Sequence, residues 1–283
     1  MNHIQQWLQF FQDVSCFFRE MFMLPLWRKY PNHSRDIWDS LAIFLEGYAF
    51  ERQGRRPDFF HAGVDALIYC RQQNNNFNQN VINMIWQHFS QLLNNQGLNP
   101  KNNPLYPSTN PNNLRNLNQS YSLIEVVINN NIHQNSTFTS YLHTLITQNQ
   151  NAQPAFNLVK DIRGIGGKIA SFFLRDLVDV MTINLQNVQN RQLLQPIDVW
   201  VERSVRILSN NPQLNRQQVA NWIVNNSLAN NLNPERINMG IWFFCSQIVI
   251  SEYRLNRILR NFNAAQNLLI DYRNRIRNVC LIC

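Results

Sequence analysis

Two segments of this chain carry residue types that could do chemistry. In "DIRGIGGKIASFF", residues 161–173, Lys168 follows a glycine turn where an apolar helix is expected to begin. In "QPIDVWVERSVRIL", residues 195–208, Asp198 stands at the start of another expected helix. A lysine amine can act as a nucleophile, and a carboxylate can act as a general base or stabilise positive charge. The elements around these two residues decide whether they could work together.

The glycine turn predicts two short helices joined by "RGIGG" in a helix–hairpin–helix arrangement. Gly164 and Gly166 can both take positive φ, and their lack of side chains lets another backbone approach. Ile165 would fill the gap between the helices. Backbone N–H groups at the start of the second helix, from Gly167 onward, would face outward and could bind a phosphate. The alternative is a tight corner between helices that binds nothing.

Two other glycine motifs do not fit this turn. A phosphate-binding loop needs G-x-x-x-x-G-K-[ST], but Ile162 stands in place of the first glycine and Ile169 in place of the hydroxyl residue. A dinucleotide fingerprint needs a preceding strand, and no strand pattern precedes the turn.

The rest of the chain reads as helix almost throughout, so the expected fold class is all-α. Apolar residues recur at helical spacing in residues 4–24, and a helix with Ser34 as its N-cap is expected to follow. Residues 72–80, 94–118 and 181–195 are rich in Asn, Gln or Pro and are expected to be loops. Further helices are predicted at 120–131, 136–148, 154–162, 168–180, 197–209, 215–229, 234–252 and 255–278.

Composition favours a polyanionic partner. The chain has 283 residues and a formal net charge of +8, and 21 of its 25 basic residues are arginine. Arginine suits phosphate recognition, although a basic surface kept for solubility would give the same balance. The last predicted helix carries Arg254, Arg257, Arg260, Arg273, Arg275 and Arg277.

The sequence also argues against a secreted, a membrane-spanning or a metal-binding protein. Residues 1–12 lack the pattern of a signal peptide, and no apolar run is long enough to span a membrane. Five scattered cysteines indicate a reducing interior, so we expect an intracellular protein of the cytoplasm or nucleoid, or of the nucleus in a eukaryote. The terminal "CLIC" has no second cysteine pair, and the histidines show no ligand spacing. No metal and no cofactor are therefore expected.

The two segments together resemble the helix–hairpin–helix DNA glycosylases with a Gly/Pro-rich loop and an aspartate, the HhH-GPD superfamily. That family's signature reads approximately L-P-G-[VI]-G-x-K-[TV]-A, then P/V-[VI]-D and an arginine near V-x-R. The direct resemblance covers about 50 residues. The matching residues are Gly164, Ile165, Gly166, Lys168 and Ala170 in the first segment, and Pro196, Asp198 and Arg203 in the second.

This chain departs from the family pattern in two places. Arg163 replaces the usual proline of the hairpin, and the gap from Lys168 to Asp198 is about a dozen residues longer than in the commonest members. The long gap and the lack of a cysteine cluster look more like the archaeal-type 8-oxoguanine glycosylases than like the iron–sulfur endonuclease III branch.

The resemblance implies a two-lobed helical fold with damaged double-stranded DNA in a cleft between the lobes. Residues 1–93 would form the N-terminal part of one lobe and 94–119 an Asn/Pro-rich connection. Residues 120–210 would form the central lobe with the hairpin and the catalytic aspartate, and 211–283 would complete the first lobe. The protein would act as a monomer.

The implied activity is base excision of an oxidised purine, with 8-oxoguanine as the favoured base, coupled to AP-lyase cleavage. Lys168 would attack C1′ and form a Schiff base that permits β-elimination. The helix N-terminus, partial burial, and Arg163 and Arg175 nearby would disfavour its ammonium form. Asp198 would stabilise the charged sugar or deprotonate the nucleophile. The alternatives are a solvated lysine on a DNA phosphate and an aspartate that only caps its helix.

Backbone binding and base recognition complete the expected site. Arg163, Gly164, Ile165, Gly166 and Gly167 would hold the DNA backbone. A base flipped out of the stack would enter a pocket of aromatic and amide groups, each of which could instead pack in the core. The candidates are Tyr48, Gln53, Phe172, Trp222, Trp242 and Gln247.

Three other functions stay open at this point. The protein could be a glycosylase for another damaged or mismatched base, a non-catalytic helix–hairpin–helix DNA-binding protein, or a purely structural helical protein.

Overall fold

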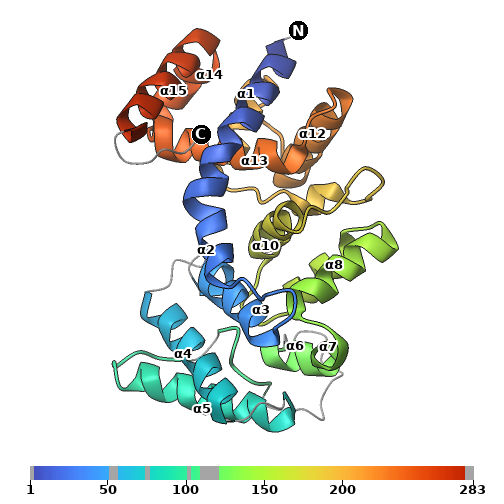
Figure 1. The fold of residues 1–283 in the computed structure, drawn as a ribbon. Helices are drawn as coiled ribbons and strands as arrows, with labels where there is room; N and C mark the ends of the chain where they lie inside the picture. The colour runs from blue at the N-terminus through green and yellow to red at the C-terminus, as the bar shows by residue number, and fades with distance from the viewer. Residues whose placement is uncertain (1–2, 51–56, 74–76, 101–102, 109–120, 278–283) are drawn as a thin grey trace. The chain divides into compact units, whose positions relative to one another are not determined.

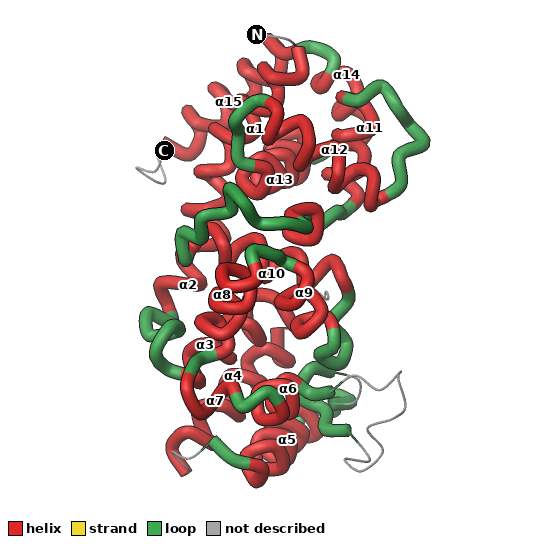
Figure 2. The backbone as a smooth tube through the Cα atoms, turned by 90° about the vertical axis from the view of Figure 1, so that its right-hand side faces the viewer, coloured by secondary structure: helices red, strands yellow, loops and turns green. Residues whose placement is uncertain are grey.

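The computed structural model describes residues 3–50, 57–73, 77–100, 103–108 and 121–277. These residues form helices and loops, and Figure 2 shows no strand among them. Extended pairing in the described ranges is limited to two isolated bridges, Tyr121 with Ile162 and Asn151 with Gln189. The expectation of an all-α protein is confirmed for this part of the chain.

The chain divides into two compact units (Figure 1). Unit 1 joins residues 1–25 to residues 191–283, and unit 2 comprises residues 26–190. The division differs from the expected boundaries, because residues 26–93 fall in the same unit as the glycine turn and residues 191–210 fall with the C-terminal helices. Each unit is described by itself below.

Unit 1 is built around the N-terminal helix. It contains α1 (His3–Phe18), which continues into a π-helical turn at Arg19–Met23, a 3-10 turn at Arg191–Leu194, α11 (Val199–Leu208), α12 (Arg216–Ala229), α13 (Pro234–Phe243) with a π-helical turn at Phe244–Val249, α14 (Glu252–Leu259) and α15 (Phe262–Arg277).

The packing of α1 against α13 organises unit 1. A Cβ at Gly240 would lie 1.7 Å from the carbonyl oxygen of Phe11, so only glycine lets the two backbones cross at this distance. Aromatic side chains fill the interface on either side of the crossing. Phe17 stacks on Phe243, and Phe10 meets Phe244 edge to face.

Unit 2 contains α3 (Ile37–Phe44) with a π-helical turn at Leu45–Phe50, α4 (Pro57–Gln73), α5 (Gln79–Asn94), α6 (Leu123–Asn129), α7 (Ile132–Asn135), α8 (Phe138–Asn149), α9 (Gln153–Lys160) and α10 (Gly167–Val180). The short helix α2 (Leu24–Lys29) contains the boundary between the units.

Phe173 of α10 lies at the centre of the aromatic core of unit 2. It is fully buried and stacks against Phe138 of α8, while Phe44 of α3 meets it edge to face. Trp27 and Tyr48 complete the cluster. This core fixes α10, whose first turn carries Lys168.

Three expected helix boundaries need correction. The N-cap of α3 is Asp36 rather than Ser34, because the Asp36 carboxylate accepts the N–H groups of Trp38 at 2.8 Å and Asp39 at 3.3 Å. The predicted helix 234–252 ends where Ile250 takes a left-handed conformation, with φ of 62°. The predicted helix 255–278 is two helices, because the Asn261 side chain accepts the N–H of Ala264 and starts α15.

Candidate functional site

The glycine turn joins α9 to α10 in unit 2, and the two helices pack against each other. Gly164 has φ of 74°, as expected, and Ile165 is buried with 5% of its surface exposed. The expectation of positive φ at Gly166 is wrong. Gly166 has φ of −86° and ψ of 168°, because it is the N-cap of α10 and extended backbone suits that position.

A short extended segment holds the turn from one side. The N–H of Arg163 donates to the carbonyl of Tyr121 at 2.7 Å, and the N–H of Tyr121 donates to the carbonyl of Asp161 at 3.2 Å. The Arg163 guanidinium lies over the ring of Tyr106, 5.2 Å from its centroid. Its buried Nε has no hydrogen-bond partner among the described residues. These contacts place a cation directly beside the turn.

The start of α10 carries backbone N–H groups that have no partner in the i→i−4 pattern of the helix. The first bond closing the helix runs from the N–H of Ala170 to the carbonyl of Gly166, at 3.1 Å. The N–H groups of Gly167, Lys168 and Ile169 therefore lie ahead of the helical ladder, and the Gly166 cap supplies no side chain to satisfy them. A Cβ at Gly166 would meet nothing within 4 Å, so the space in front of these amides is open.

Lys168 lies in this first turn, and its side chain is exposed. The expected partial burial of Lys168 is therefore wrong. The expected influence of Arg175 also needs correction, because Arg175 is fully buried and forms an ion pair with Asp176 at 2.7 Å. Positions 168 and 175 are two turns apart on one face of α10. That face is buried beyond Lys168, since all residues from Ile169 to Val178 are buried.

Two residues expected in the base pocket belong to the interior of unit 2. Tyr48 is 1% exposed, accepts a hydrogen bond from Trp27 Nε1 at 3.0 Å and donates to Asp176 Oδ2 at 2.9 Å. Phe172 is 4% exposed and lies under the Arg175 guanidinium. Both rings are buried, and the hydroxyl of Tyr48 is already paired, so neither ring presents an open face to an incoming base in this structure.

The other residues expected in the base pocket differ from Tyr48 and Phe172 in their burial and contacts. Trp222 on α12 is half-buried, and Gln247 donates from Nε2 to Ser246 Oγ at 3.2 Å. Trp242 packs edge to face against Phe18 and Phe22 of unit 1. Gln53 lies outside the described residues.

Asp198 is the N-cap of α11 in unit 1. Its Oδ1 accepts the N–H of Trp200 at 3.0 Å and the N–H of Val201 at 2.9 Å. Both capping bonds go to one oxygen, and the described residues give Oδ2 no hydrogen bond. The side chain is half-buried. The cap therefore orients the carboxylate while leaving its second oxygen available.

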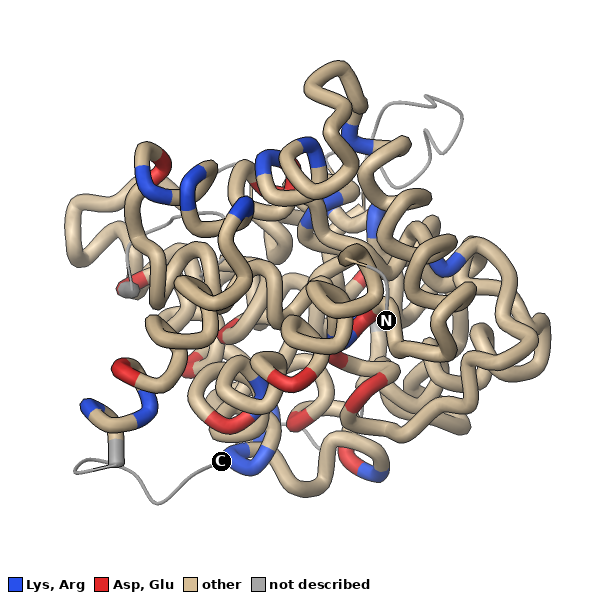
Figure 3. The backbone as a smooth tube through the Cα atoms, turned by 90° about the horizontal axis from the view of Figure 1, so that it is seen from above, with Lys and Arg blue, Asp and Glu red and all other residues tan. Residues whose placement is uncertain are grey.

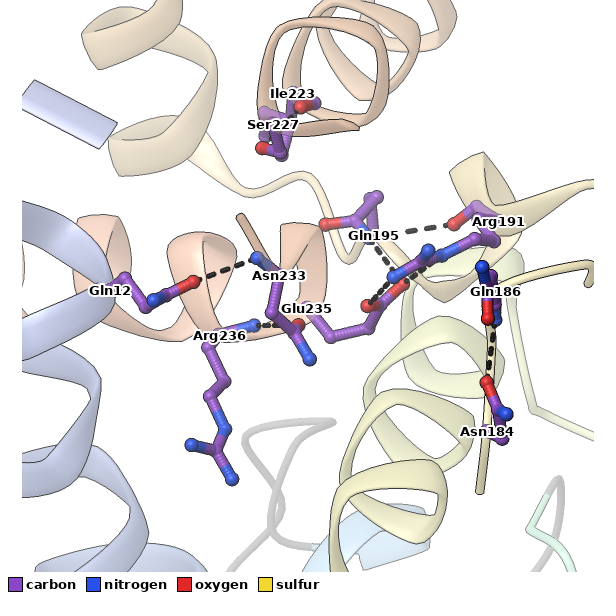
Figure 4. A network of polar contacts seen from close by, with 10 residues as sticks. All are labelled: Gln12, Asn184, Gln186, Arg191, Gln195, Ile223, Ser227, Asn233, Glu235 and Arg236. Carbon is purple, nitrogen blue, oxygen red and sulfur yellow. Dashed lines mark hydrogen bonds and ion pairs between the residues drawn. The ribbon is translucent and has the colours of Figure 1, made fainter. Parts of the chain in front are cut away.

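A buried polar network, which the sequence analysis missed, holds the segment that leads into Asp198 (Figure 4). Arg191 pairs with Glu235, with Nε 3.2 Å from Oε1 and Nη2 2.5 Å from Oε2. Gln195 donates from Nε2 to Glu235 Oε1 at 3.3 Å. Asn238 donates to the carbonyl of Pro196 at 3.2 Å. All these partners are about 40 residues apart in sequence.

Arg203, the third matching residue of the second segment, forms an ion pair with Glu252. Lys168 belongs to unit 2, whereas Asp198 and Arg203 belong to unit 1. The two expected catalytic groups are thus carried by different compact units.

Two buried cysteines offer no nucleophile. Burial raises the pKa of the Cys245 thiol to about 12 and that of the Cys70 thiol to about 11. Both thiols stay protonated at neutral pH, and the protonated form is a poor nucleophile.

Two further kinds of site were sought among the described residues: a metal-binding cluster and a membrane-spanning helix. They contain no group of three or more His, Cys, Asp or Glu side chains placed to hold a metal ion. None of the helices they form combines the length and apolar character needed to cross a membrane.

The chain is similar to a protein of an archaeon. The protein MJECL21 of Methanocaldococcus jannaschii, described as uncharacterized, is 29% identical over 212 residues. The match covers 71% of this chain and 48% of that protein, so the chain spans about half the length of this relative. No family model matches the chain, and no solved structure matches it.

Proposed function

We propose that this protein is a base-excision DNA glycosylase with AP-lyase activity that removes an oxidised purine, with 8-oxoguanine as the favoured base. The observation that carries the proposal is the exposed Lys168 in the first turn of α10, beside a glycine turn where three backbone N–H groups precede the first bond that closes the helix. The glycine turn would act as a helix–hairpin–helix motif, with the protein working inside the cell as a monomer on damaged duplex DNA.

The turn suits a DNA phosphate. A phosphate in front of Gly166 would accept hydrogen bonds from the amides of Gly167 and Lys168, with the positive end of the helix dipole behind it. Arg163, placed over Tyr106, adds a cation beside the turn. The sugar next to a phosphate held here would come within reach of a flexible lysine side chain.

Lys168 would supply the covalent step. Its amine forms a bond to C1′ as the bond between C1′ and the base breaks and the base takes up a proton. Opening of the sugar ring then gives a Schiff base. Loss of a C2′ proton breaks the bond to the 3′ phosphate, so the strand is cut without added alkali.

Asp198 would stabilise the positive charge that develops on the sugar. Its Oδ1 is held by two backbone N–H groups, which fixes the direction of the carboxylate, and Oδ2 could face the sugar or take a proton. The proposal requires that Lys168 and Asp198 reach the same nucleotide in the DNA complex.

A second candidate is a DNA-binding protein without catalysis. It is favoured by the exposure of Lys168, which suits a phosphate contact as well as a nucleophile, and by the capping role of Asp198. In this case the glycine turn grips DNA and no bond breaks.

A panel of duplexes, each with one damaged base, separates these candidates. We expect the wild-type protein to cut the 8-oxoguanine duplex without alkali, and Lys168→Gln to lose this cutting while still binding the duplex. Lys160→Gln is the matched control, because Lys160 is an exposed lysine at the end of α9, and we expect it to cut normally. Binding without cutting of any duplex, even after alkali, would establish the second candidate.

A further inference from the structure

The helix α14 of unit 1 carries a basic depression. Neither the glycine turn nor Asp198 is among the residues that line it. The depression encloses about 400 Å³ and is lined by Tyr253, Asn256, Arg257 and Arg260. Asn256, Arg257 and Arg260 follow Tyr253 by three, four and seven residues, so all four lie on one face of α14 and its C-cap, while Leu255, Ile258 and Leu259 on the other side are buried.

Tyr253 is the most exposed large hydrophobic side chain among the described residues, with 94% of its surface accessible. At this exposure both faces of the ring are open to solvent. No other described aromatic side chain stacks on it. A tyrosine ring in this state is a platform on which a nucleobase can stack, and stacking of this kind tolerates any base.

The arginines around the ring are placed for phosphate. Arg257 makes no ion pair with any residue that the structure describes. Arg260 Nε donates to Asn256 Oδ1 at 2.7 Å, which fixes the direction of its guanidinium. Glu252, the acidic residue of this helix, is already paired with Arg203 and does not neutralise Arg257. Charged positions are sparse along the described backbone (Figure 3), so Arg254, Arg257 and Arg260, which fall within residues 254–260, form a local concentration of positive charge.

We infer that this depression binds an unpaired nucleotide of a DNA strand. The base stacks on Tyr253, and the flanking phosphates contact Arg257 and Arg260. That the strand is DNA rests on the proposed function. An unpaired nucleotide is required because the bases of an intact duplex already stack on their neighbours and leave no face for the ring.

An anionic membrane is the competing partner, since Ile250, three residues before Tyr253, is 68% exposed. A helix that lies in a membrane surface needs a wide apolar face toward the lipid. The apolar side of α14 is instead buried in unit 1, which leaves one tyrosine and one isoleucine for the lipid. The arrangement therefore favours a nucleic acid.

Fluorescence anisotropy with a labelled 15-residue oligothymidylate tests the inference. We expect Tyr253→Ser to weaken binding about tenfold and Tyr253→Phe to bind as the wild type, because phenylalanine keeps the stacking face. The double variant Arg257→Gln/Arg260→Gln should lower the slope of log affinity against log salt by about 1.4, the value for two phosphate contacts on a single strand. Arg275→Gln, an exposed arginine of α15, is the matched control and should change affinity less than about twofold.

Three outcomes would overturn the inference. The first is Tyr253→Ser binding like the wild type, and the second is Arg275→Gln losing as much affinity as the double variant Arg257→Gln/Arg260→Gln. The third is binding to vesicles with 30% phosphatidylserine that depends on Tyr253, with no binding to the oligonucleotide. The proposed function is judged separately by cutting of the 8-oxoguanine duplex, which the Tyr253 variants should retain when substrate is saturating.

Discussion

Asp198→Asn is expected to slow base excision by roughly 10²–10³-fold, the loss typical of removing one electrostatic stabiliser from an active site. The substitution removes the negative charge but keeps an oxygen where Oδ1 accepts the N–H groups of Trp200 and Val201. Asparagine caps a helix about as well as aspartate, so thermal stability and DNA affinity should stay near the wild-type values. Single-turnover excision rates, melting temperature and DNA affinity check the three parts.

Asp198→Ala is the comparison that separates the cap from the chemistry. It loses both the charge and the cap, and the missing cap should cost about 1 kcal/mol of stability. For a chain of this size the melting temperature would fall by roughly 2–4 °C. A helix cap with no catalytic role predicts the opposite pattern: Asp198→Asn would excise at the wild-type rate, and only Asp198→Ala would be impaired, through stability alone.

Glu235→Ala is expected to destabilise the protein by about 3–5 kcal/mol, because it leaves a buried arginine without its counter-charge. The side chain of Arg191 is 8% exposed and that of Glu235 is 1% exposed. Gln195 would also lose its hydrogen bond to Glu235. Since Arg191 and Gln195 belong to the segment that leads into Asp198, the excision rate should fall as well. Urea unfolding followed by circular dichroism measures the first effect.

The double variant Arg191→Met/Glu235→Leu shows whether the unpaired charge is the cause. Replacing both partners of a buried ion pair by apolar residues of similar volume is often neutral or stabilising. We therefore expect the double variant to recover most of the stability lost in Glu235→Ala. If Glu235→Ala unfolds at the wild-type urea concentration, the pair carries little of the stability of unit 1.

Local patterns predicted the local features of the site. The positive φ of Gly164, the burial of Ile165 and the position of Asp198 at a helix start each depend on a few neighbouring residues, and all three agree with the structure. Spacing of apolar residues likewise predicted α9 and α10, because an amphipathic helix records its buried face in its own sequence.

Features that depend on distant partners were not predictable in this way. Tyr48 looked available for a base because its partner Asp176 lies 128 residues away. Arg175 looked like a free cation near Lys168 because nothing in the sequence shows that α10 becomes buried after its first turn. The Arg191–Glu235 pair was not predicted either, because its two residues lie 44 positions apart in the sequence.

Borohydride trapping on an 8-oxoguanine duplex, followed by mapping of the modified peptide, tests the central claim most directly. Borohydride reduces a Schiff base to a stable amine, so a lysine caught on C1′ stays attached to the DNA. The chain has only four lysines, Lys29, Lys101, Lys160 and Lys168, which makes the mapping decisive. We predict one adduct at Lys168, absent in Lys168→Gln and retained in Lys160→Gln. Attachment through another lysine, or strand cutting with no adduct, would contradict the account.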